Sequence, residues 1–143
     1  MVSIQRSALV PHSAEQMFDL VNDIENYPSF MHGCKAARVI SRSEHELVGE
    51  LSLAKAGISQ SFTTRNRLDR PNTIEMELVE GSFTSFHALW SFTALGDAAC
   101  EVRLEMEFEY KLGLLQFAAE QLFNNSANKL VDALVQRASK VYG

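Results

Sequence analysis

The sequence has few of the residues and segments on which disulfide frameworks and membrane spans depend. Its 143 residues include only two cysteines, Cys34 and Cys100, which form no CxxC pair. We expect these to be buried or half-buried thiols rather than a disulfide. No apolar run approaches the ~20 residues that a membrane-spanning helix needs. Since the first ten residues also lack the long apolar region of a signal peptide, we expect a cytoplasmic protein.

Positive charge and catalytic motifs are also scarce. The chain carries 13 lysines and arginines against 18 aspartates and glutamates, a net charge of -5 at pH 7. Because nucleic-acid binding depends on neutralising phosphates, this balance argues against DNA as a partner and leaves only a local basic patch open. None of the GxSxG, P-loop, GxGxxG or HExxH patterns occurs, and the histidines show no metal-ligand spacing. We therefore expect no catalytic residue, no metal and no cofactor.

Regular alternation of apolar and polar residues is the main structural signal in a composition that fits one domain, residues 1–143. From Val102 to Tyr110 every second residue is apolar, and the residues between are arginine or glutamate. This pattern predicts a strand with one buried and one solvated face. Short, turn-like connections predict antiparallel pairing. The expected strands are residues 3–10, 36–43, 46–54, 58–69, 73–80, 84–95 and 102–110.

Two segments have the spacing of helices instead. Ser13 and Gln16 form a capping-box pattern before an apolar stripe, which predicts a helix over 14–22. A second short turn is expected at 24–27, ended by Pro28. These one or two short helices follow directly after the first expected strand.

From Leu114 to Tyr142 apolar residues recur at steps of three or four, without a proline. This predicts a helix of about 29 residues, roughly 43 Å long at 1.5 Å per residue. Strands alone would permit a two-sheet sandwich, but a helix of this length needs an apolar surface to cover. We therefore predict an α+β fold, in which a curved seven-stranded antiparallel sheet wraps around the C-terminal helix.

A mismatch of width predicts a space between the sheet and this helix. The helix is about 10–12 Å across, whereas seven strands at ~4.8 Å span roughly 29 Å. We expect the space near the start of the long helix. The candidate lining residues are the aromatics Phe62, Phe83, Phe86, Trp90, Phe117 and Phe123, to which a lid formed by the loop at 27–31 would add Tyr27 and Phe30. The alternative is that these rings simply fill the core.

Charged surface residues allow two interpretations. Arg65 and Arg67 share one face of an expected strand, with Arg103 nearby, and either pair with glutamates across strands or contact phosphate-rich RNA. The glutamates at 105, 107 and 109 fit a solvated strand face rather than paired catalytic carboxylates. The segment "YPSFM" (27–31) either plugs the edge of the sheet, acts as a mobile lid over the space, or contacts a membrane or a partner.

The whole chain resembles the helix-grip proteins of the START-like superfamily, and within it the branch of coenzyme Q-binding proteins and the bacterial ribosome-association toxin. The stretches that carry the resemblance are "VPHSAEQMFDLVNDIENYPSFMHGC" (10–34), "LVEGSFTSFHALWSF" (78–92), "CEVRLEMEFEY" (100–110) and "LVDALVQRASKVYG" (130–143). One departure is Ser82, where the family often has proline in "EGPF".

The resemblance implies a lipophilic cavity and a role without catalysis. Its first implied function is binding of ubiquinone or a related polyprenyl lipid in support of respiratory electron transport, with transient contact at the inner membrane. Its second is association with the large ribosomal subunit, which blocks subunit joining. START-like folds also include aromatase/cyclase enzymes, but the inward positions predicted here are almost all apolar, with Thr64 and Asn66 as exceptions.

Overall fold

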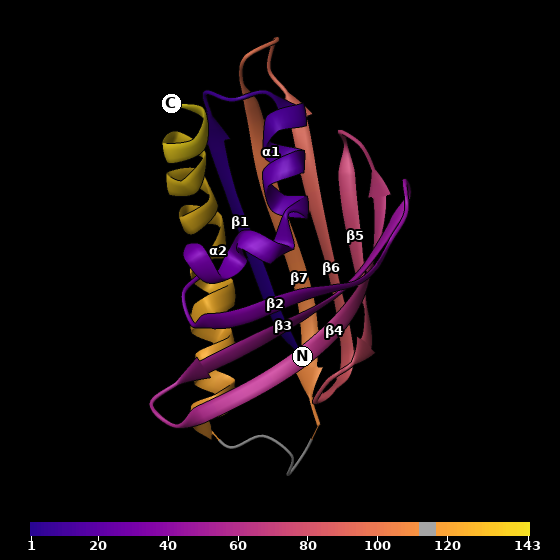
Figure 1. Cartoon of the computed structure of the whole chain (residues 1–143), viewed down its shortest axis with the longest axis vertical. Coiled ribbons are helices and arrows are strands. Elements are labelled where there is room, and N and C mark those ends of the chain that lie inside the picture. The colour runs from indigo at the N-terminus through magenta and orange to yellow at the C-terminus, as the bar shows by residue number, and fades with distance from the viewer. Residues whose placement is uncertain (112–116) are drawn as a thin grey trace.

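The computed structural model describes residues 1–111 and 117–143 (Figure 1). Within these residues the elements follow in the order β1 (Val2–Val10), α1 (Ala14–Asn22), the 3-10 helix η1 (Ile24–Ser29), β2 (Cys34–Arg42), β3 (Glu46–Lys55), β4 (Ile58–Asp69), β5 (Thr73–Glu80), β6 (Phe83–Ala94), β7 (Cys100–Tyr110) and α2 (Phe117–Tyr142). The predicted α+β class and the seven strands are confirmed, with strand ends shifted by one or two residues.

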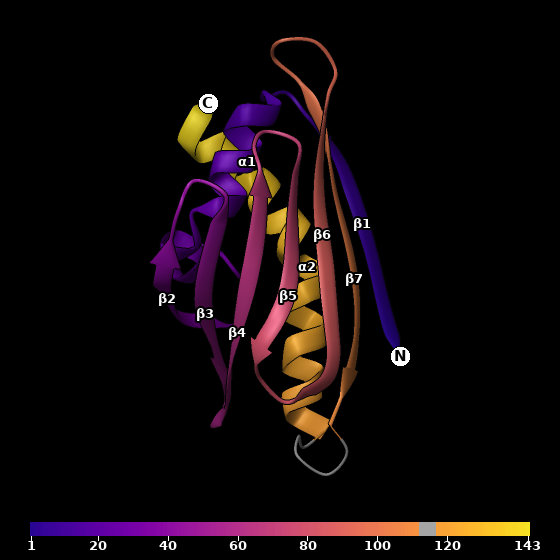
Figure 2. The same cartoon turned by 90° about the vertical axis from the view of Figure 1, so that its right-hand side faces the viewer.

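The strands form one antiparallel sheet in the order β1-β7-β6-β5-β4-β3-β2 (Figure 2). The first strand therefore lies beside the last, with Val2 opposite Phe108 and Val10 opposite Cys100. All other neighbours are joined by short connections, as the hairpin-like turns predict. β1 and β2 are the two edges of this sheet.

Alternation along the strands sets which side chains enter the core. In β7 the apolar residues from Val102 to Phe108 are buried, and Arg103 and Glu107 between them are exposed. In β4 every second residue from Phe62 to Leu68 is buried, so Thr64 and Asn66 point inward with the apolar residues. Thr63, at a register shift beside β5, is buried as well. The sheet thus has one dry face and one wet face.

The capping box at the start of α1 is present as predicted. The backbone N–H of Gln16 donates to Ser13 Oγ at 3.1 Å, and the N–H of Ser13 donates to Gln16 Oε1 at 3.0 Å. The prediction that Pro28 ends the next turn is wrong, because η1 continues to Ser29. Its last turn is closed by the N–H groups of residues 30 and 31, which both donate to the carbonyl of Tyr27 and do not involve the nitrogen of Pro28.

The long helix α2 lies along the dry face of the sheet (Figures 1 and 2). Its 26 described residues span about 39 Å at 1.5 Å per residue; residues 114–116 of the predicted helix lie outside the described residues. Buried alanines at 119, 127 and 138 allow close approach to the strands. β1 runs beside α2, whereas β3 and β4 cross it obliquely (Figure 1). No helix in the described residues is long and apolar enough to cross a membrane.

Candidate functional site

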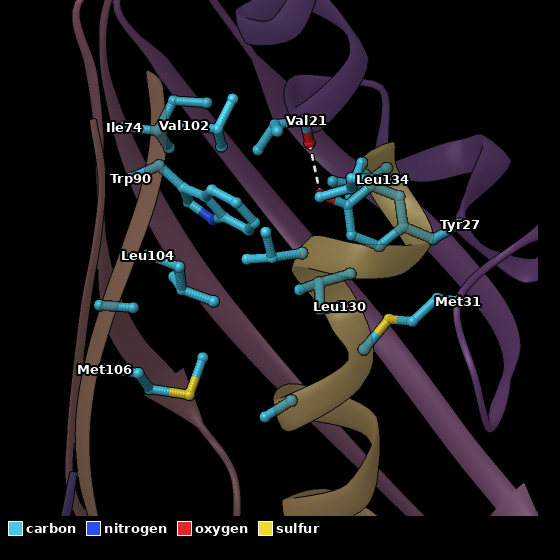
Figure 3. Packing of buried hydrophobic residues seen from close by; sticks show 14 of the residues in the cluster. Val21, Tyr27, Met31, Ile74, Trp90, Val102, Leu104, Met106, Leu130 and Leu134 are labelled. Atoms are coloured by element: carbon cyan, nitrogen blue, oxygen red, sulfur yellow. Dashed lines mark hydrogen bonds between the residues drawn. The ribbon is translucent and has the colours of Figure 1, made fainter. Parts of the chain in front are cut away.

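A cavity lies between the dry face of the sheet and the middle of α2. The space open to the centre of a water-sized sphere is about 50 Å³. β3 to β7 form one wall and α2 forms the opposite wall, while α1, η1 and Met31 close a third side. In Figure 3, Trp90 and Met106 point from the strands toward Leu130 of α2.

Five of the eight predicted lining residues border this cavity: Tyr27, Phe62, Phe86, Trp90 and Phe123. Phe83 is buried but lies behind them, against other rings. Phe30 lies on the outer side of η1, where it contacts Tyr27 and Arg137. Phe117 does not belong to the site, because 75% of its surface is exposed.

The sequence predicts a space near the start of α2, because the sheet is wider than the helix. Packing of aromatic rings explains why the cavity is not there. The ring centroid of Phe123 lies 5.0 Å from that of Phe108, 5.1 Å from Phe83 and 5.5 Å from Phe62. These rings fill the space around the first turns of α2, so the predicted position near the helix start is wrong. The cavity lies farther along the helix, beside Phe123 and residues 126–130. Both interpretations of the aromatics therefore hold in part: most of them fill the core, and five also border a space.

Several polar groups face the cavity without enough partners. The hydroxyl of Thr64 donates to Asn66 Oδ1 at 2.8 Å. Ser126 is 1% exposed, and neither its Oγ nor Asn22 Oδ1 has a hydrogen-bond partner among the described residues. An unsatisfied buried polar group costs about 1–3 kcal/mol. The cavity therefore presents unused hydrogen-bonding groups to whatever enters it.

Among the described residues that border the cavity, Tyr27 is the one that can titrate. Its hydroxyl donates to the carbonyl of Val21 at 2.6 Å (Figure 3). Burial, followed by the neighbouring Cys34 and Asp23, raises the pKa of Tyr27 well above its ordinary value. The phenol consequently stays protonated at neutral pH, and its hydrogen bond holds η1 against α1.

The segment 27–31 closes the cavity on the β2 side of the sheet. Tyr27 and Met31 are both buried and border the space. η1 can lie this close to the sheet because β3 has glycine at position 49: a Cβ there would overlap the Cδ1 atom of Ile24. The position fits a plug at the sheet edge, and the mobility that a lid needs stays a prediction.

The histidines and cysteines are dispersed. His87 Nε2 lies 3.2 Å from Glu75 Oε2 on the wet face, and the ring of His12 packs against Tyr142. Both cysteines are free and buried, and burial raises the pKa of each thiol. Within residues 1–111 and 117–143, no group of three or more histidine, cysteine or acidic side chains could hold a metal ion.

The arginines on the wet face of the sheet are paired with carboxylates. The pairs are Arg65 with Glu46 at 3.0 Å, Arg67 with Glu75 at 3.3 Å and Arg103 with Glu105 at 2.8 Å. This arrangement confirms the interpretation as a solvated face with glutamate partners. These arginines are thus already neutralised by their neighbours.

A second hollow, which the sequence does not reveal, lies between η1 and the outer side of α2. It has a volume of about 220 Å³ and is bordered by Ser29, Phe30, Ala133, Gln136, Arg137 and Lys140. The helical spacing of 136 and 140 marks a polar side of α2, but nothing local indicates that η1 lies against it. The asparagine at 22 and the serine at 126 were also missed, although a serine within an apolar helical stripe is a recognisable signal.

Comparison with known proteins places the chain among START-like sequences. A family model described as polyketide cyclase / dehydrase and lipid transport matches residues 10–135. The chain is 46% identical over 140 residues to the ribosome association toxin RatA of Pseudomonas aeruginosa, covering 98% of this chain and 97% of that protein. It is 40% identical to the Escherichia coli protein of the same name, covering 99% and 90%. The mitochondrial coenzyme Q-binding protein COQ10 homolog B of Xenopus laevis is 22% identical, covering 99% and 60%.

Solved structures match the fold more broadly. The ZhuI aromatase/cyclase of Streptomyces sp. R1128 superposes with a TM-score of 0.82 at 16% identity, covering 99% of this chain and 96% of that chain. A protein of Thermus thermophilus gives a TM-score of 0.84 at the same identity, covering 99% and 100%. At this identity the likeness shows the fold alone, and it confirms the predicted helix-grip architecture.

Proposed function

This chain belongs to the polyketide cyclase / dehydrase and lipid transport family, and we propose that within it the protein associates with the large ribosomal subunit and blocks subunit joining. The observation that carries this proposal is 46% identity, over nearly the full length of both chains, to a protein named for ribosome association. Sequence reasoning ranks ubiquinone binding first because the net charge is -5. The relatives favour the second role instead.

The proposed mechanism is binding rather than catalysis. Because the proposed partner is a ribosomal subunit, the proposed location is the cytoplasm. Support comes from the cavity, where the titratable group, Tyr27, is held protonated by burial. Thr64 and Asn66 satisfy each other in part and form no acid–base pair. A folded body seated on one subunit is sufficient to block joining by exclusion, without any covalent step.

Gradient sedimentation tests the proposal. The purified chain is mixed with separated large and small ribosomal subunits at about 50 mM and about 200 mM salt, and the fractions are assayed for the protein. We expect it to migrate with the large subunit at low salt and to be released as salt rises, because phosphate contacts weaken with ionic strength. Absence from the large-subunit fractions at low salt would contradict the proposal.

A second candidate function is binding of an apolar ligand in the cavity. What favours it is the combination of apolar walls with the unpartnered oxygens of Asn22 and Ser126, together with the distant likeness to a coenzyme Q-binding protein. The cavity of about 50 Å³ is far below the roughly 300–1,000 Å³ of typical ligand sites. Ubiquinone or another polyprenyl lipid would therefore bind only if α2 or η1 moves outward.

The single tryptophan gives this second candidate a direct measurement. Trp90 borders the cavity and is the chain's only tryptophan, so its fluorescence reports on entry of a ligand. We expect saturable quenching by a short-tailed ubiquinone, and recovery of quinone by solvent extraction and mass spectrometry. Linear, non-saturating quenching, together with no quinone in the solvent extract, would show that the cavity does not bind ubiquinone.

A further inference from the structure

The outer side of α2 carries three positive side chains that have no acidic partner. Lys129, Arg137 and Lys140 are separated by eight and then three residues, so they project from one side of the helix. Lys129 and Lys140 are exposed and Arg137 is half-buried. Within the described chain none of the three takes part in an ion pair. Together they form what we call the α2 basic face, about 17 Å long at 1.5 Å per residue.

The groove beside this face is built to receive an anion. Arg137 places its guanidinium carbon 5.7 Å from the ring centroid of Phe30, which holds the group in place by a cation–π contact. Its Nε–H is buried and lacks a hydrogen-bond partner among the described residues. Lys140, Gln136 and Ser29 complete the polar rim of a hollow of about 220 Å³, and no carboxylate borders it. A planar guanidinium at the edge of a groove is well suited to phosphate, which would meet its outer N–H groups because the Nε–H is buried.

Most of the other arginines are paired with carboxylates, whereas Lys35, Lys55 and Lys111 also form no ion pair within the described residues and Arg6 donates to Asn128 Oδ1 instead. Arg38, Arg42 and Arg70 pair with glutamate or aspartate, as do the arginines on the wet face of the sheet. Asp132 of α2 lies three residues after Lys129 on the adjoining side of the helix but forms no ion pair with it. The net charge of -5 therefore conceals a local surface where positive charge is unused.

The positive surface continues past the N-terminal end of the α2 basic face. The backbone N–H of Ala54 donates to the carbonyl of Gly33 at 2.9 Å, which ties the end of β3 to the loop against α2. His32 stands in this loop, within electrostatic reach of Lys129 and Lys55. Partial burial, and then the charges of Lys129 and Lys55, lower the pKa of His32. The three groups thus share one region of positive potential.

We propose that the α2 basic face and its groove bind phosphate groups of ribosomal RNA in the large subunit. This inference rests on the function proposed above and names the surface that carries it. Arg137 and Lys140 bind phosphate at the groove, and Lys129 extends the contact along the helix. RNA is favoured over a lipid surface because four of the six residues that border the groove carry hydrogen-bond donors, and the two apolar ones, Phe30 and Ala133, are half-buried rather than exposed anchors.

The test compares two double variants with the same change of charge. R137Q/K140Q removes two positive charges from the α2 basic face, and R65Q/R67Q removes two from the wet face of the sheet. Binding of each intact protein to large subunits is measured by sedimentation over a series of salt concentrations. We expect R137Q/K140Q to bind roughly tenfold more weakly at low salt and to lower the salt slope by about two, one for each lost phosphate contact. We expect R65Q/R67Q to bind like the parent.

The other possible results distinguish failure of the proposed function from failure of the proposed surface. If the parent protein fails to bind large subunits, the proposed function and this inference both fall. If the parent binds and R137Q/K140Q binds equally well, the proposed function stands and the α2 basic face is the wrong surface. If both double variants weaken binding equally, only overall charge matters and the site is overturned.

Two further controls separate folding and lipid binding from RNA binding. R137K keeps the charge and should retain most of the salt slope, and thermal melts followed by circular dichroism show whether each variant folds. Vesicles containing phosphatidylglycerol replace ribosomal subunits in a parallel experiment. If R137Q/K140Q loses binding to vesicles but not to subunits, the face recognises lipid and the RNA assignment is wrong.

Discussion

The two sides of α2 differ in nearly every physical respect. The inner side buries Phe123, Leu130 and Leu134 against the sheet, and its one irregularity is the small cavity. The outer side presents Lys129 and Arg137 to solvent and to the groove beside η1. One helix thus serves the stability of the fold on one side and offers unused charge on the other. Substitutions should therefore separate stability from ribosome binding, and the following predictions test that separation.

The largest effect is expected on the inner side. Phe123 is 2% exposed and packs against several other rings, so F123A should lower the free energy of unfolding by about 3–5 kcal/mol. The matched control is F117A on the same helix, which removes an exposed ring and should stay within about 0.5 kcal/mol of the parent. Urea denaturation measures both. Equal losses in the two variants would mean that the buried ring does not anchor α2.

A smaller effect is expected where η1 meets the sheet, because η1 borders both the cavity and the groove. G49A adds a Cβ that overlaps Ile24 Cδ1, which should cost about 1–3 kcal/mol of unfolding free energy. I24V removes that Cδ1 atom, so the double variant G49A/I24V should lose less than the sum of the two single variants. Strict additivity of the losses would contradict this packing of η1.

At the cavity itself the expected change has the opposite sign. S126A removes a buried hydroxyl that lacks a partner, and should raise the unfolding free energy by up to about 1 kcal/mol. S139A, at an exposed position of the same helix, should change it by less than about 0.5 kcal/mol. A loss of stability in S126A would indicate that the hydroxyl already has a partner, such as a bound molecule.

The smallest effect concerns pH and the outer side. Because the pKa of His32 is lowered from 6.5 in the folded chain, the unfolded chain binds more protons at pH values just below 6.5. Stability should accordingly rise with pH through this range and be fully present above 6.5. The effect should be small because the ring is largely solvated. NMR titration should show that K129Q raises the pKa of His32 while K140Q leaves it unchanged. An unchanged pKa in K129Q would mean that Lys129 does not act on His32 electrostatically.

Most of the fold is predictable from the sequence because its strands alternate cleanly. In β7 and β4 the apolar period of two identifies both the strand and the side that is buried, and these segments need no distant information. The long helix is equally clear from its period near 3.6. What the pattern cannot supply is the end of η1, since the bonds that continue it past Pro28 come from backbone groups of residues 30 and 31.

The candidate site is predictable only in part. The aromatics of β4 and β6 border the cavity because strand alternation orients them correctly. Helical spacing alone could have excluded Phe117 from the cavity lining. At 100° per residue it lies about 200° around the helix from the buried Ala119, on nearly the opposite side. The groove and the contact of Phe30 with Arg137 were beyond reach, because they join segments more than one hundred residues apart.

Chemical footprinting of lysines tests the separation of the two sides of α2 most directly. The intact protein is acetylated with and without a saturating amount of large ribosomal subunits, and each lysine is quantified by mass spectrometry. The account predicts that Lys129 and Lys140 become protected while Lys111, at the end of β7, reacts as before. Stable binding to the subunit with unchanged reactivity at Lys129 and Lys140 would contradict it.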